Sequence, residues 1–204
     1  MKYITVALGM MPTNSYIVYD ESTLKAAIID PAADCAKIER YLNRYSLDLK
    51  YILLTHGHAD HIGAVNELKE KTDAKLVMTS ADVDMIFESA YNESRLIFGE
   101  EYVIDAYPEI ILEDGDVLDF DGVNIKCIHT PGHTKGSCVY VCEDLMFSGD
   151  TLFYQGCGRT DLHGGSAADL RASLNKLYSI KENLTVLPGH MYPTTLDKER
   201  NLFM

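Results

Sequence analysis

Histidine and aspartate side chains are concentrated in one short stretch of the chain. The segment "THGHADH", residues 55–61, holds His56, His58, Asp60 and His61 directly after the apolar run "YILL". A solvated loop has no need of four such groups, and a core could not bury them without dedicated partners. Imidazole and carboxylate groups are together the donors that zinc, iron(II) and manganese prefer. The segment therefore predicts a metal-binding loop.

Three further side chains of the same kind follow other apolar strands. His133 comes after "VNIKCIHT", Asp150 after "DLMFSG" and His190 after "LTVLPG". Functional groups are often carried by loops at the ends of strands in a rigid fold. We therefore expect the four loops that carry these side chains to lie side by side. Seven donors are too many for one tetrahedral ion, and they suit two ions that share a carboxylate. The expected assignment is His56, His58 and His133 on the first ion, Asp60, His61 and His190 on the second, and Asp150 as the bridge.

Such a site predicts hydrolytic chemistry. Water held between two cations ionises near neutral pH, because metal ions lower its pKa from 15.7 to about 7. We expect Asp60 to bind a metal and also to orient the bridging hydroxide that attacks a carbonyl carbon. Zinc is the expected metal, with iron or manganese as alternatives. Two histidines fall outside this pattern: His129 is interpreted as structural, and His163, in a glycine-rich turn, as a bystander.

Composition limits the class of protein. With 204 residues and 47% hydrophobic residues, the chain is expected to form one domain, residues 1–204. A net charge of −13 disfavours binding to nucleic acid. No window approaches the roughly 18 apolar residues of a membrane span, and the start does not resemble a signal peptide. Five cysteines without a CxxC pair suggest reduced thiols. These features favour a cytoplasmic protein that does not bind membranes.

Hydrophobic periodicity predicts an α/β protein. Alternating or apolar runs predict strands over 3–8, 15–20, 25–30, 51–55, 74–79, 116–130, 137–149 and 183–189. Helical spacing predicts helices over 34–47, from Ile62 to about Leu68, from about Ser80, and over 166–180. Asp34 is the expected N-cap of the first, and Ser166 with Asp169 forms the expected capping box of the last. Residues 89–112 lack a clear period and are interpreted as a connection. The pattern indicates two packed sheets with helices outside.

The segments "THGHADH", "TPGHTKGS", "SGDTLF" and "LPGH" together resemble the motif set of the metallo-β-lactamase superfamily. They span residues 55 to 190, nearly the whole chain. The resemblance implies an αββα four-layer sandwich with a binuclear metal site at one edge of the sheets. β-Lactamase activity itself is not expected, because those enzymes are usually exported and no export signal is visible.

The segment "GDTLFYQGCGRTDLHGG" resembles the glyoxalase II branch, which hydrolyses hydroxyacyl thioesters of glutathione. That resemblance implies a small anionic thioester as substrate, with Arg159 binding its carboxylate. Tyr192, two residues after His190, is a second expected substrate-binding residue. Two departures stand out. The sequence ends 14 residues after His190, so it is similar to the compact form that lacks the C-terminal helical domain. Asp161 stands where glyoxalase II tends to have a substrate-binding tyrosine.

Other activities remain open at this point. Persulfide dioxygenases of the same superfamily keep the histidine-rich loop but use a single iron, which by resemblance would be held by His56, His133 and Asp150. They also have a tyrosine at the position of Tyr192. A lactonase or another hydrolase of the superfamily is a further alternative, and a non-enzymatic metal-binding module is disfavoured by the seven-donor set. The acyl group, the thiol carrier and the oligomeric state are not determined by the sequence.

Overall fold

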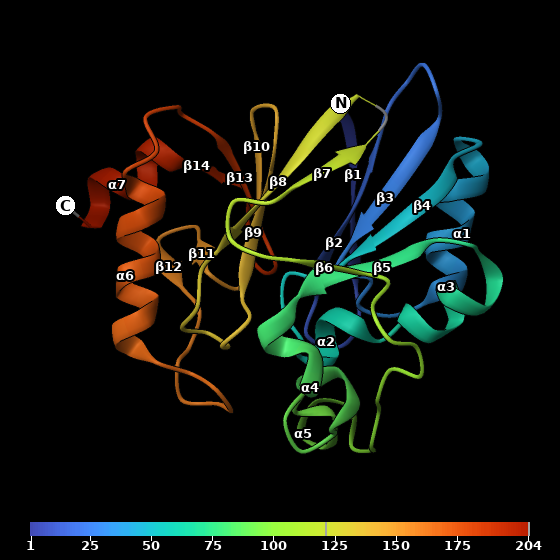
Figure 1. The fold of residues 1–204 in the computed structure, drawn as a ribbon, viewed down its shortest axis with the longest axis horizontal. Helices are drawn as coiled ribbons and strands as arrows, with labels where there is room; N and C mark the ends of the chain where they lie inside the picture. Colours follow the sequence, from blue (N-terminus) through green and yellow to red (C-terminus); the bar gives the residue numbers. More distant parts are fainter. Residues whose placement is uncertain (121, 204) are drawn as a thin grey trace.

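Two six-stranded sheets form the centre of the molecule (Figure 1). The structure is a computed structural model that describes residues 1–120 and 122–203; Asp121, inside one of the expected strand regions, and Met204 lie outside the described residues. The first sheet has antiparallel pairing from β1 to β3 and parallel pairing from β3 to β6. Its strands in order are β1 (Lys2–Leu8), β2 (Thr13–Tyr19), β3 (Lys25–Ile29), β4 (Asp48–Leu53), β5 (Lys75–Thr79) and β6 (Ile110–Leu112).

The second sheet is antiparallel except where β10 and β13 pair in parallel. Its strands in order are β14 (Thr194–Thr195), β13 (Thr185–Pro188), β10 (Leu145–Gly149), β9 (Cys138–Cys142), β8 (Val123–His129) and β7 (Val117–Phe120). A small hairpin of β11 (Leu152–Phe153) and β12 (Gly156–Cys157) follows β10. Strands β8, β10 and β13 therefore run in the same direction and end at the same edge of the sheet.

Helices cover the outer faces of both sheets (Figure 1). The helices associated with the first sheet are α1 (Cys35–Arg44), α2 (Ala59–Ile62), α3 (Val65–Lys71), α4 (Val83–Phe87) and α5 (Ser94–Phe98), with a 3₁₀ turn at Ser80–Asp82 before α4. Those of the second sheet are α6 (Ala167–Tyr178) and α7 (Leu196–Phe203). In the view of Figure 1, α1 and α3 lie on the right, α6 and α7 on the left, and the sheets between them.

Three buried clusters fill the three interfaces between these layers. Because side chains alternate across a strand, Ile17 of β2 packs toward α1 and α3, whereas Tyr16 and Val18 pack between the two sheets. Phe120, Tyr140 and Phe147 meet them from the second sheet. The third cluster lies between the second sheet and helices α6 and α7. The αββα four-layer sandwich expected from the sequence is confirmed.

The N-cap residues expected from the sequence are found at the start of α1 and α6. The carboxylate of Asp34 accepts a hydrogen bond from the Lys37 amide at the start of α1, and the Ser166 hydroxyl accepts one from the Asp169 amide at the start of α6. The helix expected from Ile62 is instead interrupted at Gly63 and Ala64, between α2 and α3, and Gly63 lies so close to the Ala32 carbonyl that a Cβ there would collide with it. The connection expected over 89–112 contains α5 and the short strand β6.

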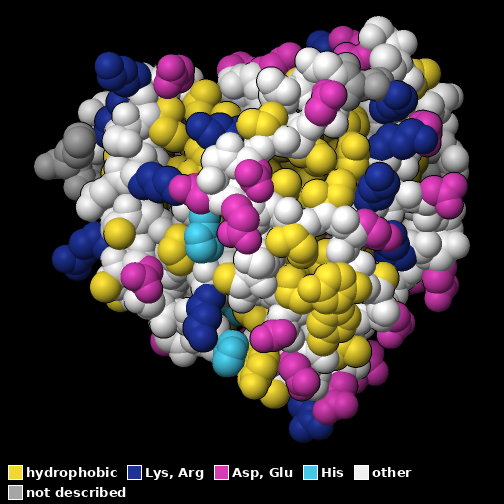
Figure 2. Space-filling model, in the orientation of Figure 1, with side chains coloured by type: hydrophobic (Ala, Val, Ile, Leu, Met, Phe, Trp, Pro, Cys, Tyr) yellow, Lys and Arg dark blue, Asp and Glu magenta, His cyan; other side chains and the backbone are white. Residues whose placement is uncertain are grey.

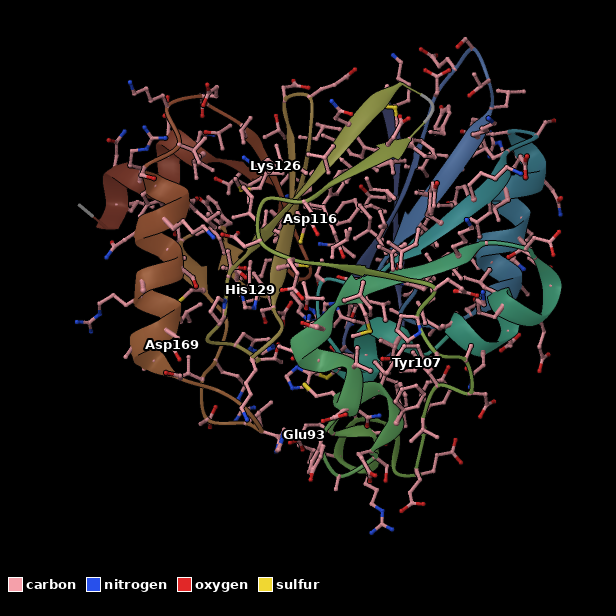
Figure 3. The ribbon with its side chains drawn as sticks, viewed as in Figure 1. Glu93, Tyr107, Asp116, Lys126, His129 and Asp169 are labelled. Atoms are coloured by element: carbon pink, nitrogen blue, oxygen red, sulfur yellow. The ribbon has the colours of Figure 1, made fainter. Side chains whose placement is uncertain are left out.

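Charged groups of both signs are interspersed on the face of the molecule shown in Figure 2, and hydrophobic side chains gather around Tyr107, the position labelled in Figure 3. Four of the five cysteines are buried, Cys157 is exposed, and all five are free thiols. Within residues 1–120 and 122–203, no helix is long and apolar enough to cross a membrane.

Candidate metal centre

The seven donors expected from the sequence meet at one edge of the sandwich. His56 and His58 follow β4, and Asp60 and His61 lie in α2, at the lower edge of the sheets in Figure 1. His133 follows β8, Asp150 follows β10 and His190 follows β13. The parallel direction of β8, β10 and β13 brings their ends to this edge, and the packing of the two sheets places them opposite the end of β4.

His56, His58 and His133 form the first group. All three are buried, and one ring nitrogen of each lies within 4.8 Å of the others. Nδ1 of His58 is 2.9 Å from Nε2 of His133. Three converging imidazoles from two loops are a donor set suited to a zinc-type ion.

Asp60, His61 and His190 form the second group, again with donor atoms within 4.8 Å of one another. Nε2 of His190 lies 3.3 Å from Oδ2 of Asp60, and Nε2 of His61 lies 3.8 Å from the same oxygen. The Thr13 hydroxyl, 3.4 Å away, donates a hydrogen bond to this oxygen and holds the Asp60 carboxylate in place.

Asp150 lies between the two groups. Its Oδ1 is 3.4 Å from Nε2 of His61, while its Oδ2 is 3.6 Å from Nε2 of His133 and 3.6 Å from Nε2 of His190. The carboxylate thus reaches donors of both groups, which is the position that a bridging ligand requires. Gly189 makes room for it, since a Cβ at that position would collide with Oδ1 of Asp150.

Buried atoms without partners test whether the site fits metal ions. Nε2 of His56, His58 and His61 and Oδ1 of Asp150 are buried and have no hydrogen-bond partner among the residues that the structure describes. Buried polar atoms are nearly always satisfied, and an ion is one recognised reason for a cluster of exceptions. Because the four atoms belong to the two groups and their bridge, the donor set fits divalent metal ions.

Protonation favours metal binding by the first group. Burial, followed by the neighbouring imidazoles, lowers the pKa of His56 far below its usual value, and burial with His133 lowers the pKa of His58 to about 3. Both rings are therefore neutral at pH 7, which is the form that binds a metal. Burial raises the pKa of Asp150, but the nearby histidines, His61 first, outweigh it and keep the carboxyl ionised.

In the second group, nearby carboxylates outweigh burial and raise the pKa values of the histidines. Burial lowers the pKa of His61, yet the carboxylates of Asp150, Asp60 and Asp30 outweigh burial and raise it well above the usual value. The pKa of His190 is likewise raised against burial, chiefly by its hydrogen bond with Asp60. The carboxylates thus favour positive charge at this position, and a divalent cation would replace the protons.

Asp30, which is not among the seven expected ligands, holds His61 in place. Its Oδ2 lies 2.9 Å from Nδ1 of His61, so that Nε2 faces the metal position. The same carboxylate accepts hydrogen bonds from the amide and hydroxyl of Thr55. Asp30 is buried at the end of β3. A carboxylate on the remote nitrogen fixes the tautomer of a ligating histidine, and the signal was available, since "KAAIID" is another apolar strand that ends in aspartate.

Asp82, also missed, joins the loops that carry the first group. This buried carboxylate accepts hydrogen bonds from the Gly57 amide, the Thr134 hydroxyl and the Gly136 amide. Burial raises its pKa, although these three donors oppose the shift. Since Gly57 lies between the first two histidines and Thr134 follows the third, Asp82 fixes their separation. The Arg159 carbonyl, 2.7 Å from Nδ1 of His133, orients that ring.

The loop that carries His190 is held by the second strand. The Asn14 amide donates to the Gly189 carbonyl, its side chain donates to the carbonyls of Pro188 and Met191, and the Tyr16 hydroxyl donates to Pro188. These hydrogen bonds connect residues more than 170 positions apart in the sequence. They explain why one sheet edge can hold donors from both halves of the chain.

A cavity of about 380 Å³ opens above the donors and is lined in part by His58, Asp60, His133, Asp150 and His190. Arg159 also lines it, but its guanidinium makes a two-pronged ion pair with Asp161, at 2.7 and 2.8 Å.

The expected second substrate-binding residue, Tyr192, and the two histidines outside the pattern do not line this cavity. Tyr192 is 77% exposed and does not line it. His163 stacks on Tyr91 and lines a separate cavity with Lys135. His129 is labelled in Figure 3. Its Nε2 lies 2.9 Å from the Lys135 carbonyl oxygen, which fits a structural role.

Two sheets between helical layers, with histidine and aspartate donors at one edge, define a metal-binding protein of αββα architecture. The family model of the metallo-β-lactamase superfamily matches residues 8–190. The chain belongs to that superfamily.

Individual relatives match most or all of the chain. The probable metallo-hydrolase YqgX of Bacillus subtilis is 33% identical and covers 100% of this chain and 98% of its own. The hydroxyacylglutathione hydrolase GloC of Haemophilus influenzae is 31% identical, with 92% of this chain and 89% of the relative covered.

Solved structures agree with this placement. The B3 metallo-β-lactamase BLEG-1 has a TM-score of 0.94 at 32% identity, covering 100% of both chains. The protein TTHA1623 in a di-iron-bound form has a TM-score of 0.85 at 33% identity, covering 96% of both. ETHE1 from Myxococcus xanthus has a TM-score of 0.79 at 29% identity, covering 98% of this chain and 82% of its own.

Proposed function

We propose that this protein is a binuclear metal-dependent thioester hydrolase of the glyoxalase II type. The observation that carries the proposal is the position of Asp150, within 3.6 Å of donors in both groups. Two donor groups joined by one carboxylate suit two ions, with zinc as the first choice and iron or manganese as alternatives. The similarity to GloC, whose name denotes a hydroxyacylglutathione hydrolase, supports a thioester as substrate.

His56, His58 and His133 would hold one ion, Asp60, His61 and His190 the other, and Asp150 both. Bound metal ions would lower the pKa of water and polarise a carbonyl group. Asp60 has one oxygen fixed by Thr13 and His190, and it lines the cavity, so its carboxylate can accept a hydrogen bond from the attacking water and orient it. Among the described residues that line the cavity there is no lysine or tyrosine. A thiolate leaving group suits such a site because it leaves without a strong general acid.

The thiol carrier is proposed to lie toward Arg159. This residue lines both the metal-centre cavity and a groove of about 480 Å³ along α6, which also contains Arg171 and Asn175. Two arginines in a protein of net charge −13 support an anionic group on the carrier.

A metal count together with a substrate panel tests the proposal. Protein purified without added metal should contain about two equivalents of divalent metal and hydrolyse lactoylglutathione or a neutral acyl thioester. Chelation should abolish the activity, and metal should restore it. No hydrolysis of any thioester by the two-metal protein would refute the proposal.

Two other activities should be assayed beside thioester hydrolysis. The likeness to ETHE1 and the sequence resemblance favour a persulfide dioxygenase as the second candidate, which predicts a single iron and sulfur-dependent oxygen uptake. The likeness to BLEG-1 makes β-lactam hydrolysis the necessary control. The metal count separates the hydrolase from the mononuclear alternative, because only the hydrolase would use Asp60, His61 and His190 as ligands of a second ion.

A further inference from the structure

The cavity above the metal centre has a polar floor and apolar walls. The donors of the two groups form the floor. The walls come from segments far apart in the sequence and are almost entirely hydrophobic: Met11, Leu96, Ile97, Phe153, Leu162 and Met191. Its volume of about 380 Å³ is within the range of small-molecule sites.

Three of the six wall residues are unusually exposed for their type. Leu96 of α5 is 72% exposed, Met191 63% and Met11 53%. Single exposed apolar side chains are normal on protein surfaces, whereas a group around one opening marks a binding site. Phe153 connects this wall to the floor, since its ring lies edge-on to His190 with 6.2 Å between centroids. Methionines at the opening can adapt to ligands of different shape.

Charged groups in the walls are few. Apart from the floor, only Glu93 and Arg159 line the described part of the cavity, and the Arg159 guanidinium is paired with Asp161. Glu93, labelled in Figure 3 at the start of α5, is half-buried and negatively charged, so it disfavours an anionic group. Among the described residues of the walls there is also no hydroxyl or amide side chain for a polar substituent of the acyl group.

We infer that the cavity binds a neutral, apolar acyl chain of medium length, in preference to a small hydroxyacyl group. The inference rests on the proposed thioester hydrolase and names the acyl arm of its substrate. The scissile carbonyl lies over the floor, and the hydrocarbon chain contacts Leu96, Met11 and Met191. An anionic carrier on the Arg159 side is compatible with this arrangement, because it extends from the other side of the thioester.

A chain-length series tests the inference. Acetyl, propanoyl, butanoyl and hexanoyl thioesters of the neutral thiol N-acetylcysteamine, with the lactoyl thioester beside them, isolate the acyl arm. We expect kcat/KM to rise about threefold to fourfold with each added methylene, which corresponds to about 0.8 kcal/mol. Propanoyl should exceed lactoyl, which differs only by a hydroxyl. A flat or falling series, or a preference for lactoyl, would overturn the inference.

Variants of the wall locate the effect. Leu96→Ser should lower the ratio of hexanoyl to acetyl kcat/KM about tenfold, and Met11→Ser should lower it in the same direction. Leu202→Ser is the matched control, because Leu202 is also an exposed leucine in a helix (55%) and lies outside the cavity. An equal change in the ratio for Leu96→Ser and Leu202→Ser would contradict a contact with the acyl chain.

Binding without turnover separates this inference from the proposed function. The thioether S-hexyl-N-acetylcysteamine cannot be hydrolysed and can be titrated into the metal-loaded protein labelled at its methionine methyl groups. The NMR signals of Met11 and Met191 should shift, while that of the buried Met146 should stay unchanged. If no thioester is hydrolysed but these signals shift, the proposed function fails and the apolar cavity remains supported. Absence of the shifts refutes the inference whether or not hydrolysis is seen.

Discussion

Oδ2 of Asp30 lies 2.9 Å from Nδ1 of His61, and both side chains are buried. The pair joins the end of β3 to α2 and leaves Nε2 of His61 facing Asp60 and Asp150. Through this contact Asp30 determines which nitrogen of His61 is presented to the other donors of the second group.

Asp30→Asn tests that relationship. The amide group of asparagine can donate to Nδ1 and so favour the tautomer whose Nε2 carries a proton, which opposes metal binding. We expect the affinity of the second metal position to fall about 10-fold to 100-fold, with the first position little changed. Stepwise metal titration by calorimetry measures both. The control is the exposed Asp73→Asn; equal affinities in Asp30→Asn and wild type would contradict the assignment.

Asp82 should matter for stability before any metal binds. Removal of its carboxylate leaves the Gly57 amide, the Thr134 hydroxyl and the Gly136 amide without their acceptor in a buried position. Each such loss costs about 1–3 kcal/mol, so Asp82→Ala should lower the free energy of unfolding by about 3 kcal/mol or more. Denaturant unfolding in the presence of a chelator measures it. Asp84→Ala, an exposed neighbour, is the control, and a loss below about 1 kcal/mol for Asp82→Ala would show that other acceptors replace it.

The contrast between Asp30 and Asp82 shows what the sequence could predict. The seven proposed ligands all lie in segments that follow four apolar strands, so each has a signal within its own segment, and the parallel strand directions bring them together. Asp30 has the same signal and could have been included. Asp82 has none, because its role depends on Gly57 and Gly136, which are 25 and 54 residues away.

The same contrast between local signals and distant contacts applies to the helices and strands. Strands and helices with strong periodicity, such as β2 and α6, were predicted within a few residues of their bounds. Strand β6 has three residues and is defined by its pairing with β5, more than 30 positions earlier, so no local pattern reveals it. Helix α5 has only five residues and begins after Glu93 in the left-handed conformation, which sequence periodicity does not indicate. The ion pair between Arg159 and Asp161 could not be predicted either, because it depends on the geometry of the two side chains.

That ion pair predicts a measurable titration. Asp161 accepts two hydrogen bonds from Arg159, which lower its pKa to about 2. Because the pKa in the folded protein is below its ordinary value, the pair contributes stability above about pH 4, and this contribution is lost as the pH falls toward 2. In Arg159→Ala the carboxyl of Asp161 should titrate near 3.8. Carboxyl-carbon NMR measures the shift, and a pKa that stays near 2 would assign it to another group.

The ion pair between Arg159 and Asp161 should also affect the KM of anionic substrates. If Arg159 binds an anionic carrier, Asp161 competes with that anion. Asp161→Asn should therefore lower KM for an anionic thioester by a small factor, about 1.4-fold to 5-fold, because an exposed ion pair is weak. Arg159→Ala should raise KM for the same substrate, and neither variant should change KM for a neutral thioester. Steady-state kinetics on glutathione and N-acetylcysteamine thioesters of one acyl group give the comparison. Changes of equal size on both carriers would remove Arg159 from carrier recognition.

His190 distinguishes the two-metal hydrolase from the single-iron alternative. It belongs to the second group, with Nε2 3.3 Å from Asp60 and 3.6 Å from Asp150, and the first group is complete without it. In the hydrolase, His190→Ala should leave about one metal per chain and reduce thioester hydrolysis by well over 100-fold, because the residue binds a metal directly. In a mononuclear enzyme the same residue would act only through its neighbours, and its loss would cost at most about 10-fold to 100-fold. Elemental analysis beside a steady-state thioester assay measures both quantities, with the exposed His163→Ala as the control. A wild-type protein that holds one iron, and a His190→Ala variant that keeps that iron and its sulfur-dependent oxygen uptake, would exclude the hydrolase.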